Sequence, residues 1–216
     1  MVKVYQRKTG QVVELTEYKA DLLDKFYGTA WGCFLLPILT RPSLSYLLTL
    51  KDYTSFSRKK IAAFVETYQL NLADYEDGPY SSFAAFFQRR IKPALRPVCS
   101  DSQVLAVADA KLEAFTISQD LQLTIKGQIY SLADLLLDKE LAQKFSSGTA
   151  LVYRLGVEDL HRYLATESGR IIQRRKIKGR LHTVRQVAQK RRLIYKENKR
   201  EYCLLDTDLG PVLQME

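Results

Sequence analysis

The sequence has 216 residues, a length that suits one domain or two small ones and is sufficient to bury a hydrophobic core. With 46% hydrophobic and 26% charged residues, its composition excludes an intrinsically disordered chain. Lysine and arginine number 33 against 24 aspartates and glutamates. The net charge of +9 therefore favours anionic partners: nucleic acid, an acidic membrane surface or a phosphorylated substrate.

Cysteine and histidine usage excludes further classes. Cys33, Cys99 and Cys203 lie far apart and form no CxxC pair, which argues against a disulfide scaffold and a zinc ribbon and indicates a reducing compartment. Two histidines, His161 and His182, are too few for a histidine-rich metal site, so no metal is expected. The charged opening does not resemble a signal peptide, and no apolar run reaches the roughly 20 residues of a spanning helix.

The chain divides near the segment bounded by Pro93 and Pro97. The N-terminal portion, residues 1–96, shows mainly helical patterns. Helices are predicted over residues 15–27, over 57–68 with Ser57 as N-cap, and over 81–90, where Pro93 ends the last one. The very apolar stretch 31–50 has two interpretations. It either packs as core between helices or faces a membrane, and its length suits lying on a bilayer rather than crossing it.

After Pro97 the apolar period changes to that of strands. Strands are predicted over residues 104–107, 112–117, 121–125, 150–155, 169–173, 181–184, 193–196 and 202–206. One helix is predicted over 131–145, with a helix stop at 146–149 and a turn at Gly127. The sequence therefore predicts an α+β fold. A helical, membrane-associating N-terminal portion (1–96) packs on a β-rich, barrel- or sandwich-like C-terminal portion (97–216), as one functional unit.

Basic residues gather between residues 170 and 200. Thirteen lysines and arginines there face one acid, Glu197, which gives +12 for this stretch and about −3 for the rest of the chain. One interpretation is a solvated basic face of a β-rich domain. The other is an anion-binding surface, where each cation near an anionic membrane contributes roughly 1 kcal/mol.

Five blocks combine features that carry chemistry. They are residues 86–97 (FFQRRIKPALRP), 107–112 (VADAKL), 153–164 (YRLGVEDLHRYL), 178–184 (KGRLHTV) and 196–202 (KENKREY). Taken singly, each has a structural interpretation, such as a proline-braced linker, a turn aspartate or a structural histidine. Asp109, between apolar residues, is expected to be partly buried and so to need a partner.

Taken in this order, the five blocks resemble the phosphatidylserine decarboxylases. Residues 5–10 (YQRKTG) and 56–61 (FSRKKI) resemble the family's type II branch, and residues 125–136 (IKGQIYSLADLL) add to the resemblance. It runs from about Val4 to the last residue and covers the family's β-chain region.

The resemblance implies a proenzyme that cleaves its own chain at a serine, leaving a β chain and a short α chain that begins with a pyruvoyl group. This cofactor forms a Schiff base with phosphatidylserine and serves as an electron sink for loss of CO₂, giving phosphatidylethanolamine. The implied partners are phosphatidylserine, an anionic membrane surface and the α chain. The implied location is cytoplasmic, peripheral at the inner membrane, and a homo-oligomer is left open.

The family's self-cleavage uses an Asp–His–Ser arrangement. By resemblance Asp109 is the aspartate, although its neighbours depart from the family's Ser-Pro-x-Asp-Gly. His161 and Arg162 match the start of the family's His-Arg-x-His, but its second histidine is Leu164 here. A leucine takes no proton, so His182 is a candidate substitute, and His161 itself is another.

Lys111, Arg162 and Arg200 are the candidate anion- and substrate-binding residues. The family's Gly-Ser-Thr cleavage motif is not among the 216 residues, which stop where a Val-Gly-Ala segment is expected. The chain as given is therefore expected to be inactive alone, and it offers no residue for the pyruvoyl group. The alternatives are a non-catalytic lipid-binding homologue and, least favoured, a nucleic-acid-binding protein.

Overall fold

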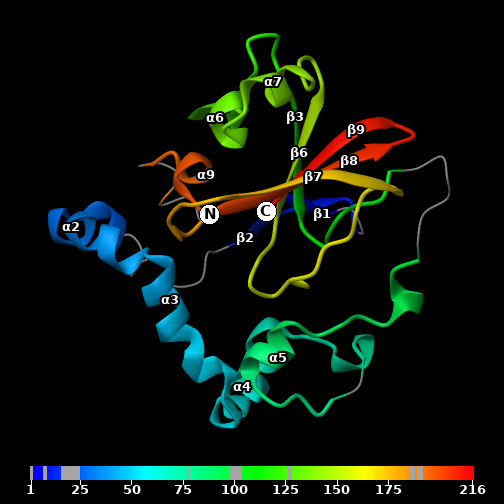
Figure 1. The fold of residues 1–216 in the computed structure, drawn as a ribbon. Coiled ribbons are helices and arrows are strands. Elements are labelled where there is room, and N and C mark those ends of the chain that lie inside the picture. The colour runs from blue at the N-terminus through cyan, green and yellow to red at the C-terminus, as the bar shows by residue number, and fades with distance from the viewer. Residues whose placement is uncertain are drawn as a thin grey trace. The chain divides into compact units, whose positions relative to one another are not determined.

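The computed structural model describes residues 2–6, 9–15, 25–76, 78–97, 104–125, 128–184, 188 and 192–216 (Figure 1). The predicted α+β class is confirmed, because most helices lie in the first half of the chain and most strands in the second. The described strands form small open sheets and no closed barrel.

The helices are α2 (Ala30–Leu39), α3 (Pro42–Thr49), α4 (Lys59–Tyr68), α5 (Phe83–Phe87), α6 (Leu132–Leu136), α7 (Lys139–Gln143) and α9 (Ile194–Glu197), with 3₁₀ turns at Leu50–Tyr53, Ser55–Arg58, Leu72–Asp74 and Pro93–Leu95. The strands are β1 (Val2–Gln6), β2 (Gln11–Leu15), β3 (Lys111–Thr116), β4 (Gln122–Ile125), β5 (Gln128–Ser131), β6 (Thr149–Arg154), β7 (Gly169–Ile177), β8 (Arg200–Thr207) and β9 (Gly210–Met215).

The chain divides into two compact units, and each joins segments from both halves of the sequence. The first unit comprises Met1–Ser45, Phe115–Ala150 and Lys176–Glu201, and the second comprises Tyr46–Ala114, Leu151–Arg175 and Tyr202–Glu216.

The first unit opens on a β-hairpin that the helical interpretation of the N-terminal portion did not foresee. Strands β1 and β2 pair antiparallel, from Val2 opposite Leu15 to Gln6 opposite Gln11. The turn between them includes Gly10, whose φ of 70° suits a residue without a side chain. Most of the predicted helix 15–27, like the predicted turn at Gly127, lies outside the described residues.

The predicted helix 131–145 is wrong as a single element. It is two short helices, α6 and α7, because Leu137 takes a left-handed conformation with φ 51°. Asp138 then begins α7 as its N-cap, since its carboxylate accepts a hydrogen bond from the Leu141 amide at 2.9 Å. The segment 146–149 follows α7, as predicted for a helix stop.

The second unit contains an aromatic core around α4 and α5. Phe64 of α4 makes edge-to-face contacts with Phe83, Phe86 and Phe87 of α5, at centroid distances of 5.4, 5.8 and 6.4 Å. The prediction of Ser57 as the N-cap of α4 is wrong. Its hydroxyl oxygen accepts from the Phe83 amide at 2.8 Å and so joins the two helical segments instead.

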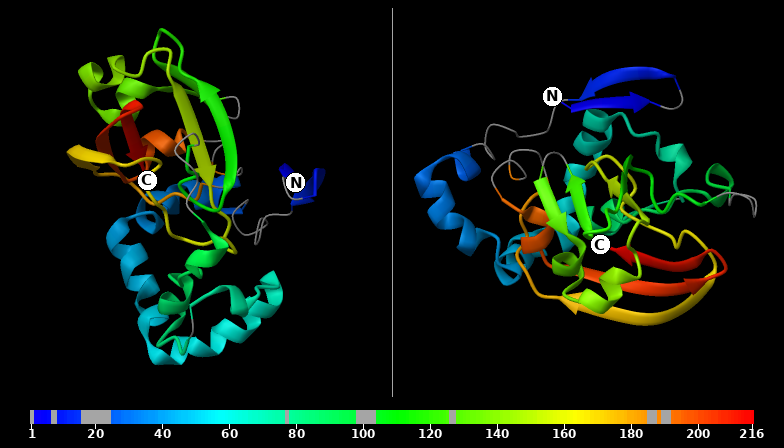
Figure 2. Two further views of the ribbon diagram at one scale, coloured as in Figure 1. Left: turned by 90° about the vertical axis from the view of Figure 1, so that its right-hand side faces the viewer. Right: turned by 90° about the horizontal axis from the view of Figure 1, so that it is seen from above.

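Strands β7, β8 and β9 form one sheet and lie side by side in Figure 2. The strands predicted near β3, β4, β6, β7 and β8 are confirmed, whereas β5 and β9 were not predicted. Three predicted strands are wrong: residues 104–107 and 181–184 are irregular, and residues 193–196 lie largely in the helix α9. An isolated short apolar run does not distinguish strand from helix, so packing against other segments decides.

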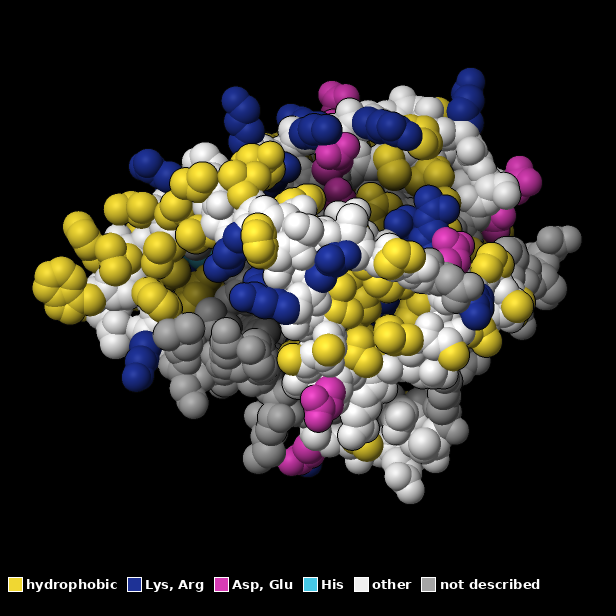
Figure 3. Space-filling view, turned by 90° about the horizontal axis from the view of Figure 1, so that it is seen from below, with side chains coloured by type: hydrophobic (Ala, Val, Ile, Leu, Met, Phe, Trp, Pro, Cys, Tyr) yellow, Lys and Arg dark blue, Asp and Glu magenta, His cyan; other side chains and the backbone are white. Residues whose placement is uncertain are grey.

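Helix α2 buries only Gly32 and Leu36 and leaves the rest of its apolar surface open. The large exposed side chains are those of Trp31, Phe34, Leu35, Ile38 and Leu39. Figure 3 shows apolar side chains gathered at the edge that α2 forms. In the described part of the chain no single helix is long and apolar enough to cross a membrane. One bent pair, Ala30–Leu39 with Pro42–Tyr53, passes that test by length and composition.

Candidate functional site: two histidine centres

His161 follows β6 in the second unit, after a tight turn that begins at Gly156. The Gly156 amide donates to the Asp159 carboxylate at 2.6 Å, and the Asp159 amide donates to the Gly156 carbonyl at 3.3 Å. These two hydrogen bonds close the turn and place His161 directly after it. We call His161 and the groups around it the His161 centre.

The imidazole of His161 is fixed on two sides. Its ring stacks on the Phe87 ring, with centroids 4.2 Å apart and planes 26° from parallel, and it hydrogen-bonds to the Gly156 backbone. Its Nε2 atom is buried and has no hydrogen-bond partner among the described residues. Nδ1 is then the nitrogen that donates to Gly156, so Nε2 of the neutral ring carries the lone pair.

The charges around His161 oppose one another. Burial lowers the pKa of His161 below its ordinary 6.5. The hydrogen bond to Gly156 and the Asp159 carboxylate raise it, and the Arg89 guanidinium lowers it. Lys111 of β3 lies 3.2 Å from Glu158 and 3.9 Å from Asp159, so this predicted site residue belongs to the centre.

The carboxyls of Glu158 and Asp159 differ in the direction of their pKa shifts. Burial raises the pKa of both carboxyls, and for Asp159 this effect prevails. For Glu158 the backbone hydrogen bond and the Lys111 ammonium outweigh burial, so its pKa is lowered. Glu158 therefore keeps its negative charge more firmly than Asp159 does.

The structure places the other residues singled out around His161 in structural roles. Arg162 donates to the Gln88 carbonyl from Nε at 3.0 Å and from Nη2 at 2.8 Å. Leu164 is largely exposed, and its amide donates to the Val107 carbonyl at 2.8 Å. A leucine side chain has no group that transfers a proton, so Leu164 cannot act as an acid or a base.

Asp109 has the partner that its partial burial predicted, but that partner is Arg96. The Arg96 guanidinium donates from Nε at 2.9 and 3.0 Å and from Nη2 at 2.7 Å, a two-pronged pairing that raises the pKa of Arg96. In the part of the second unit that the structure describes, no hydrogen bond or ion pair joins Asp109 to His161. The carboxylates whose charge acts on His161 are those of Asp159 and Glu158.

His182 lies in the first unit, where the two blocks 178–184 and 196–202 come together. The Arg180 amide donates to the Glu197 carbonyl at 3.0 Å, and the Lys199 amide donates to the Arg180 carbonyl at 2.8 Å. Gly179 permits this approach, because a Cβ there would lie 2.4 Å from the backbone of Asn198 and Lys199.

The His182 ring is buried between a phenol and a carboxylate. Nδ1 lies 3.1 Å from the Tyr27 hydroxyl, and Nε2 lies 3.4 Å from the Glu197 carboxylate. The Thr183 amide donates to the Tyr27 oxygen at 3.3 Å, which leaves the phenolic proton for Nδ1. Burial lowers the pKa of His182, Glu197 raises it, and Arg192 and Arg180 lower it. We call these groups the His182 centre.

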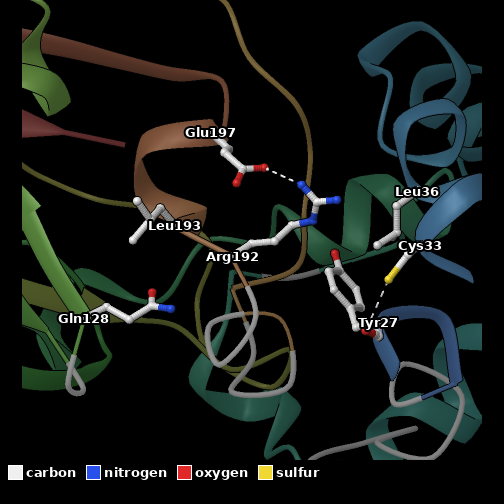
Figure 4. Close-up of a pocket in the computed structure, with 7 residues that line it drawn as sticks. All are labelled: Tyr27, Cys33, Leu36, Gln128, Arg192, Leu193 and Glu197. Atoms are coloured by element: carbon white, nitrogen blue, oxygen red, sulfur yellow. Dashed lines mark hydrogen bonds and ion pairs between the residues drawn. The ribbon is translucent and has the colours of Figure 1, made fainter. Parts of the chain in front are cut away.

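A cavity of about 620 Å³ adjoins the His182 centre within the first unit (Figure 4). Its lining comprises Tyr27, Cys33, Leu36, Gln128, Arg192, Leu193 and Glu197. Arg192 pairs with Glu197 at 3.2 Å, so both charges stand at the cavity beside the phenol. Burial raises the pKa of Tyr27, which keeps its hydroxyl protonated as a hydrogen-bond donor.

Arg200, a predicted anion-binding residue, is buried and donates to backbone carbonyls instead. Nε bonds Leu135 O at 2.7 Å, Nη1 bonds Lys196 O and Asn198 O at 2.7 and 2.9 Å, and Nη2 bonds Asp134 O at 3.0 Å. Four of the five N–H groups of the guanidinium are thus occupied. This arrangement shows that Arg200 joins α6 to α9 through backbone carbonyls.

The chemistry open to the two centres is proton transfer. His182 is buried and His161 is half-buried, each has a lowered pKa, and a neutral imidazole is a competent general base near neutral pH. Sequence reasoning missed Tyr27, Phe87, Arg89 and Glu197 as members of these centres. Phe87, Arg89 and Glu197 lie in the blocks 86–97 and 196–202, but the histidines that they meet lie elsewhere in the sequence.

The chain is similar in sequence to decarboxylases that are named as proenzymes. Residues 83–216 match the family model described as phosphatidylserine decarboxylase. Over the whole chain, the sequence is 35% identical to phosphatidylserine decarboxylase proenzyme 2 of Clostridium acetobutylicum, covering 75% of that protein. It is also 35% identical to the proenzyme of Ruminiclostridium cellulolyticum and 34% identical to that of Desulfitobacterium hafniense, covering 74% and 75% of them. The chain belongs to the phosphatidylserine decarboxylase family.

Proposed function

We propose that the protein decarboxylates phosphatidylserine to phosphatidylethanolamine at a membrane surface, as a proenzyme that first cleaves its own chain. The family match over residues 83–216 supports this proposal, together with one structural observation. His161 has a buried, unpartnered Nε2 among the described residues, which is the atom that a proton-accepting role requires.

The residues around His161 suit the pyruvoyl group that the family resemblance implies. His161, through its unpartnered Nε2, and Lys111 are the residues that would hold this group. When present, such a group supplies an electron-withdrawing carbonyl that favours loss of CO₂. His161 would accept and return a proton at Nε2, while Lys111 holds the Glu158 and Asp159 carboxylates beside it.

The surface of the chain supports membrane association. The exposed apolar side chains of α2, including Trp31 and Phe34, suit insertion at the lipid interface. On β7, Arg170, Arg174 and Lys176 are exposed on one face, which suits anionic headgroups. We propose a cytoplasmic protein that binds peripherally at the inner membrane.

The test begins with the complete reading frame of the natural gene. Intact masses are measured with and without a carbonyl-labelling reagent, and release of CO₂ is followed from carboxyl-labelled phosphatidylserine in vesicles. The proposal expects two fragments, a reactive carbonyl on the smaller one, and CO₂ release. A single unlabelled chain without CO₂ release would show that this protein is no decarboxylase.

One observation favours a second function, that of a non-catalytic lipid-binding homologue. Leu164 stands where the family has its second histidine, and its exposed side chain transfers no proton. This function expects one uncleaved chain that still binds phosphatidylserine vesicles. Trp31 is the only tryptophan, so a blue shift of its fluorescence on vesicle addition reports binding. Binding to duplex DNA with a steep salt dependence, and to no vesicle, would favour nucleic acid instead.

A further inference from the structure

Two segments of the second unit, far apart in the sequence, hold each other through reciprocal arginine contacts. From the end of α5, Arg89 Nη2 donates to the Glu158 carbonyl at 2.9 Å. In return, Arg162 Nε donates to the Arg89 carbonyl at 3.2 Å and to the Gln88 carbonyl at 3.0 Å. A planar guanidinium has donors in fixed directions, so this pair of contacts sets the position of one segment against the other.

Phe87 directly precedes Gln88, and His161 directly precedes Arg162, so both rings adjoin residues of these contacts. The two rings meet face to face. Their centroids are 4.2 Å apart with planes at 26°. Phe87 is in turn braced by Phe83 at 6.1 Å and by Phe64 at 6.4 Å. The aromatic core of α4 and α5 thereby limits rotation of the imidazole about its own axis.

Arg89 is the most deeply buried charge in this region, with 1% of its surface exposed. Its guanidinium lies over the rings of Tyr75 and Phe86, 4.6 and 5.0 Å from their centroids. Among the described residues no carboxylate pairs with it, and its Nε and Nη1 atoms have no hydrogen-bond partner. A buried cation without a counterion disfavours a second positive charge nearby. The Arg89 charge lowers the pKa of His161, which belongs to the same segment as the Glu158 carbonyl that Arg89 holds.

We propose that Phe87 and Arg89 are positioning residues for His161. Phe87 sets the plane of the imidazole, and the Arg89 cation adds to the effect of burial in keeping the ring neutral, so that Nε2 remains a proton acceptor. The opposing charges are the Glu158 and Asp159 carboxylates, which Lys111 partly offsets. The catalytic meaning of this arrangement rests on the proposed function, whereas the arrangement itself is a property of this chain.

The chain has two histidines, so a pH titration of their ring carbon-bound protons by NMR resolves both. Arg89→Gln removes the buried charge and retains a donor. It is expected to raise the pKa of His161 by at least about half a unit, because one nearby charge shifts a pKa by roughly 1–3 units. His182, in the other unit, keeps its pKa. Arg90→Gln is the matched control, since Arg90 is the adjacent exposed arginine, and it shifts neither histidine.

An unchanged His161 pKa in folded Arg89→Gln would overturn the role of Arg89. If that variant unfolds, both histidines titrate together near the ordinary value, and Arg89→Lys then decides. Arg89→Lys keeps the charge, so the pKa of His161 is expected to stay at the wild-type value. A rise of this pKa in folded Arg89→Lys would contradict the proposal.

Phe87→Leu is expected to move the His161 proton resonances through loss of the ring current, and Phe87→Tyr is expected to restore them. Unmoved resonances in Phe87→Leu would overturn the role of Phe87.

Failure of the proposed function remains distinguishable from failure of this inference. If the NMR shifts occur but the complete reading frame neither cleaves itself nor releases CO₂, the positioning stands and the decarboxylase proposal fails. If the protein cleaves itself but the shifts are absent, the inference fails alone. If both hold, Arg89→Gln slows self-cleavage and moves its pH profile upward, whereas Arg90→Gln leaves the profile unchanged.

Discussion

Asn198 holds the backbone of His182 from both sides. Its carboxamide oxygen accepts a hydrogen bond from the His182 amide at 2.8 Å, and its nitrogen donates to the His182 carbonyl at 2.9 Å. The side chain of one residue thus completes both backbone hydrogen bonds of the other across a gap of 16 positions. This pairing fixes the backbone at His182, which is not part of a strand.

Replacing Asn198 by alanine is therefore expected to lower the free energy of unfolding by about 2 kcal/mol, because two partly buried backbone groups lose their partners. Urea denaturation checks this value, with Gln122→Ala, at an exposed position of β4, as the control that changes stability little. A loss no larger than that of Gln122→Ala would mean that water replaces the carboxamide at no cost.

Gly179→Ala is expected to cost more than about 2 kcal/mol, because the added Cβ would lie 2.4 Å from backbone atoms of Asn198 and Lys199 that cannot swing aside. Gly210→Ala is the matched control. Gly210 has φ 97° and no atom within 4 Å of an added Cβ, so only conformational strain of about 1 kcal/mol applies. Thermal unfolding of both variants measures the difference, and equal losses would contradict the close approach at Gly179.

Arg200→Gln is expected to destabilise the protein by about 3 kcal/mol, because four carbonyl hydrogen bonds of a buried guanidinium are lost. Arg174→Gln, which removes an exposed arginine of β7, changes stability by no more than about 0.5 kcal/mol. Vesicle binding distinguishes a structural role from an anion-binding role. Arg174→Gln is expected to weaken binding to anionic vesicles. A stable Arg200→Gln variant with weakened vesicle binding would restore Arg200 as an anion-binding residue.

Stability is expected to fall as the pH drops below about 6.5. Burial lowers the pKa of both His161 and His182 in the folded state, so the unfolded chain takes up protons first. The stability that the neutral rings contribute is complete above the unfolded value near 6.5, and it is lost as the pH falls through the folded pKa values. Asp159, with a raised pKa, acts in the opposite direction and over a lower range.

Urea denaturation at pH 8.0 and at pH 5.5 measures this dependence. His182→Asn removes one of the two titrating rings, so the difference in unfolding free energy between the two pH values is expected to shrink. A difference as large as in the wild type would show that His182 does not titrate abnormally in the folded protein.

Local sequence signals predicted several elements well. The alternation of apolar residues found β3, β4, β6 and β8. The helix predicted over residues 81–90 is present only as α5, Phe83–Phe87, where Ser82 is the N-cap and accepts from the Ala85 amide at 3.1 Å. They failed where a single residue redirects the chain, as Leu137 and Asp138 do between α6 and α7. A left-handed residue followed by a strong N-cap interrupts a helix that the apolar spacing alone would continue.

The sequence by itself determined the family and the order of the blocks, because five motifs in register do not depend on their contacts. Only the tertiary structure decided the partner of each charge. Asp109 meets Arg96, Arg200 meets carbonyls of α6, and His161 meets Phe87. Burial makes an unpaired charge or polar atom costly, so its partner is whichever group the folded chain brings within reach, and sequence distance does not show that.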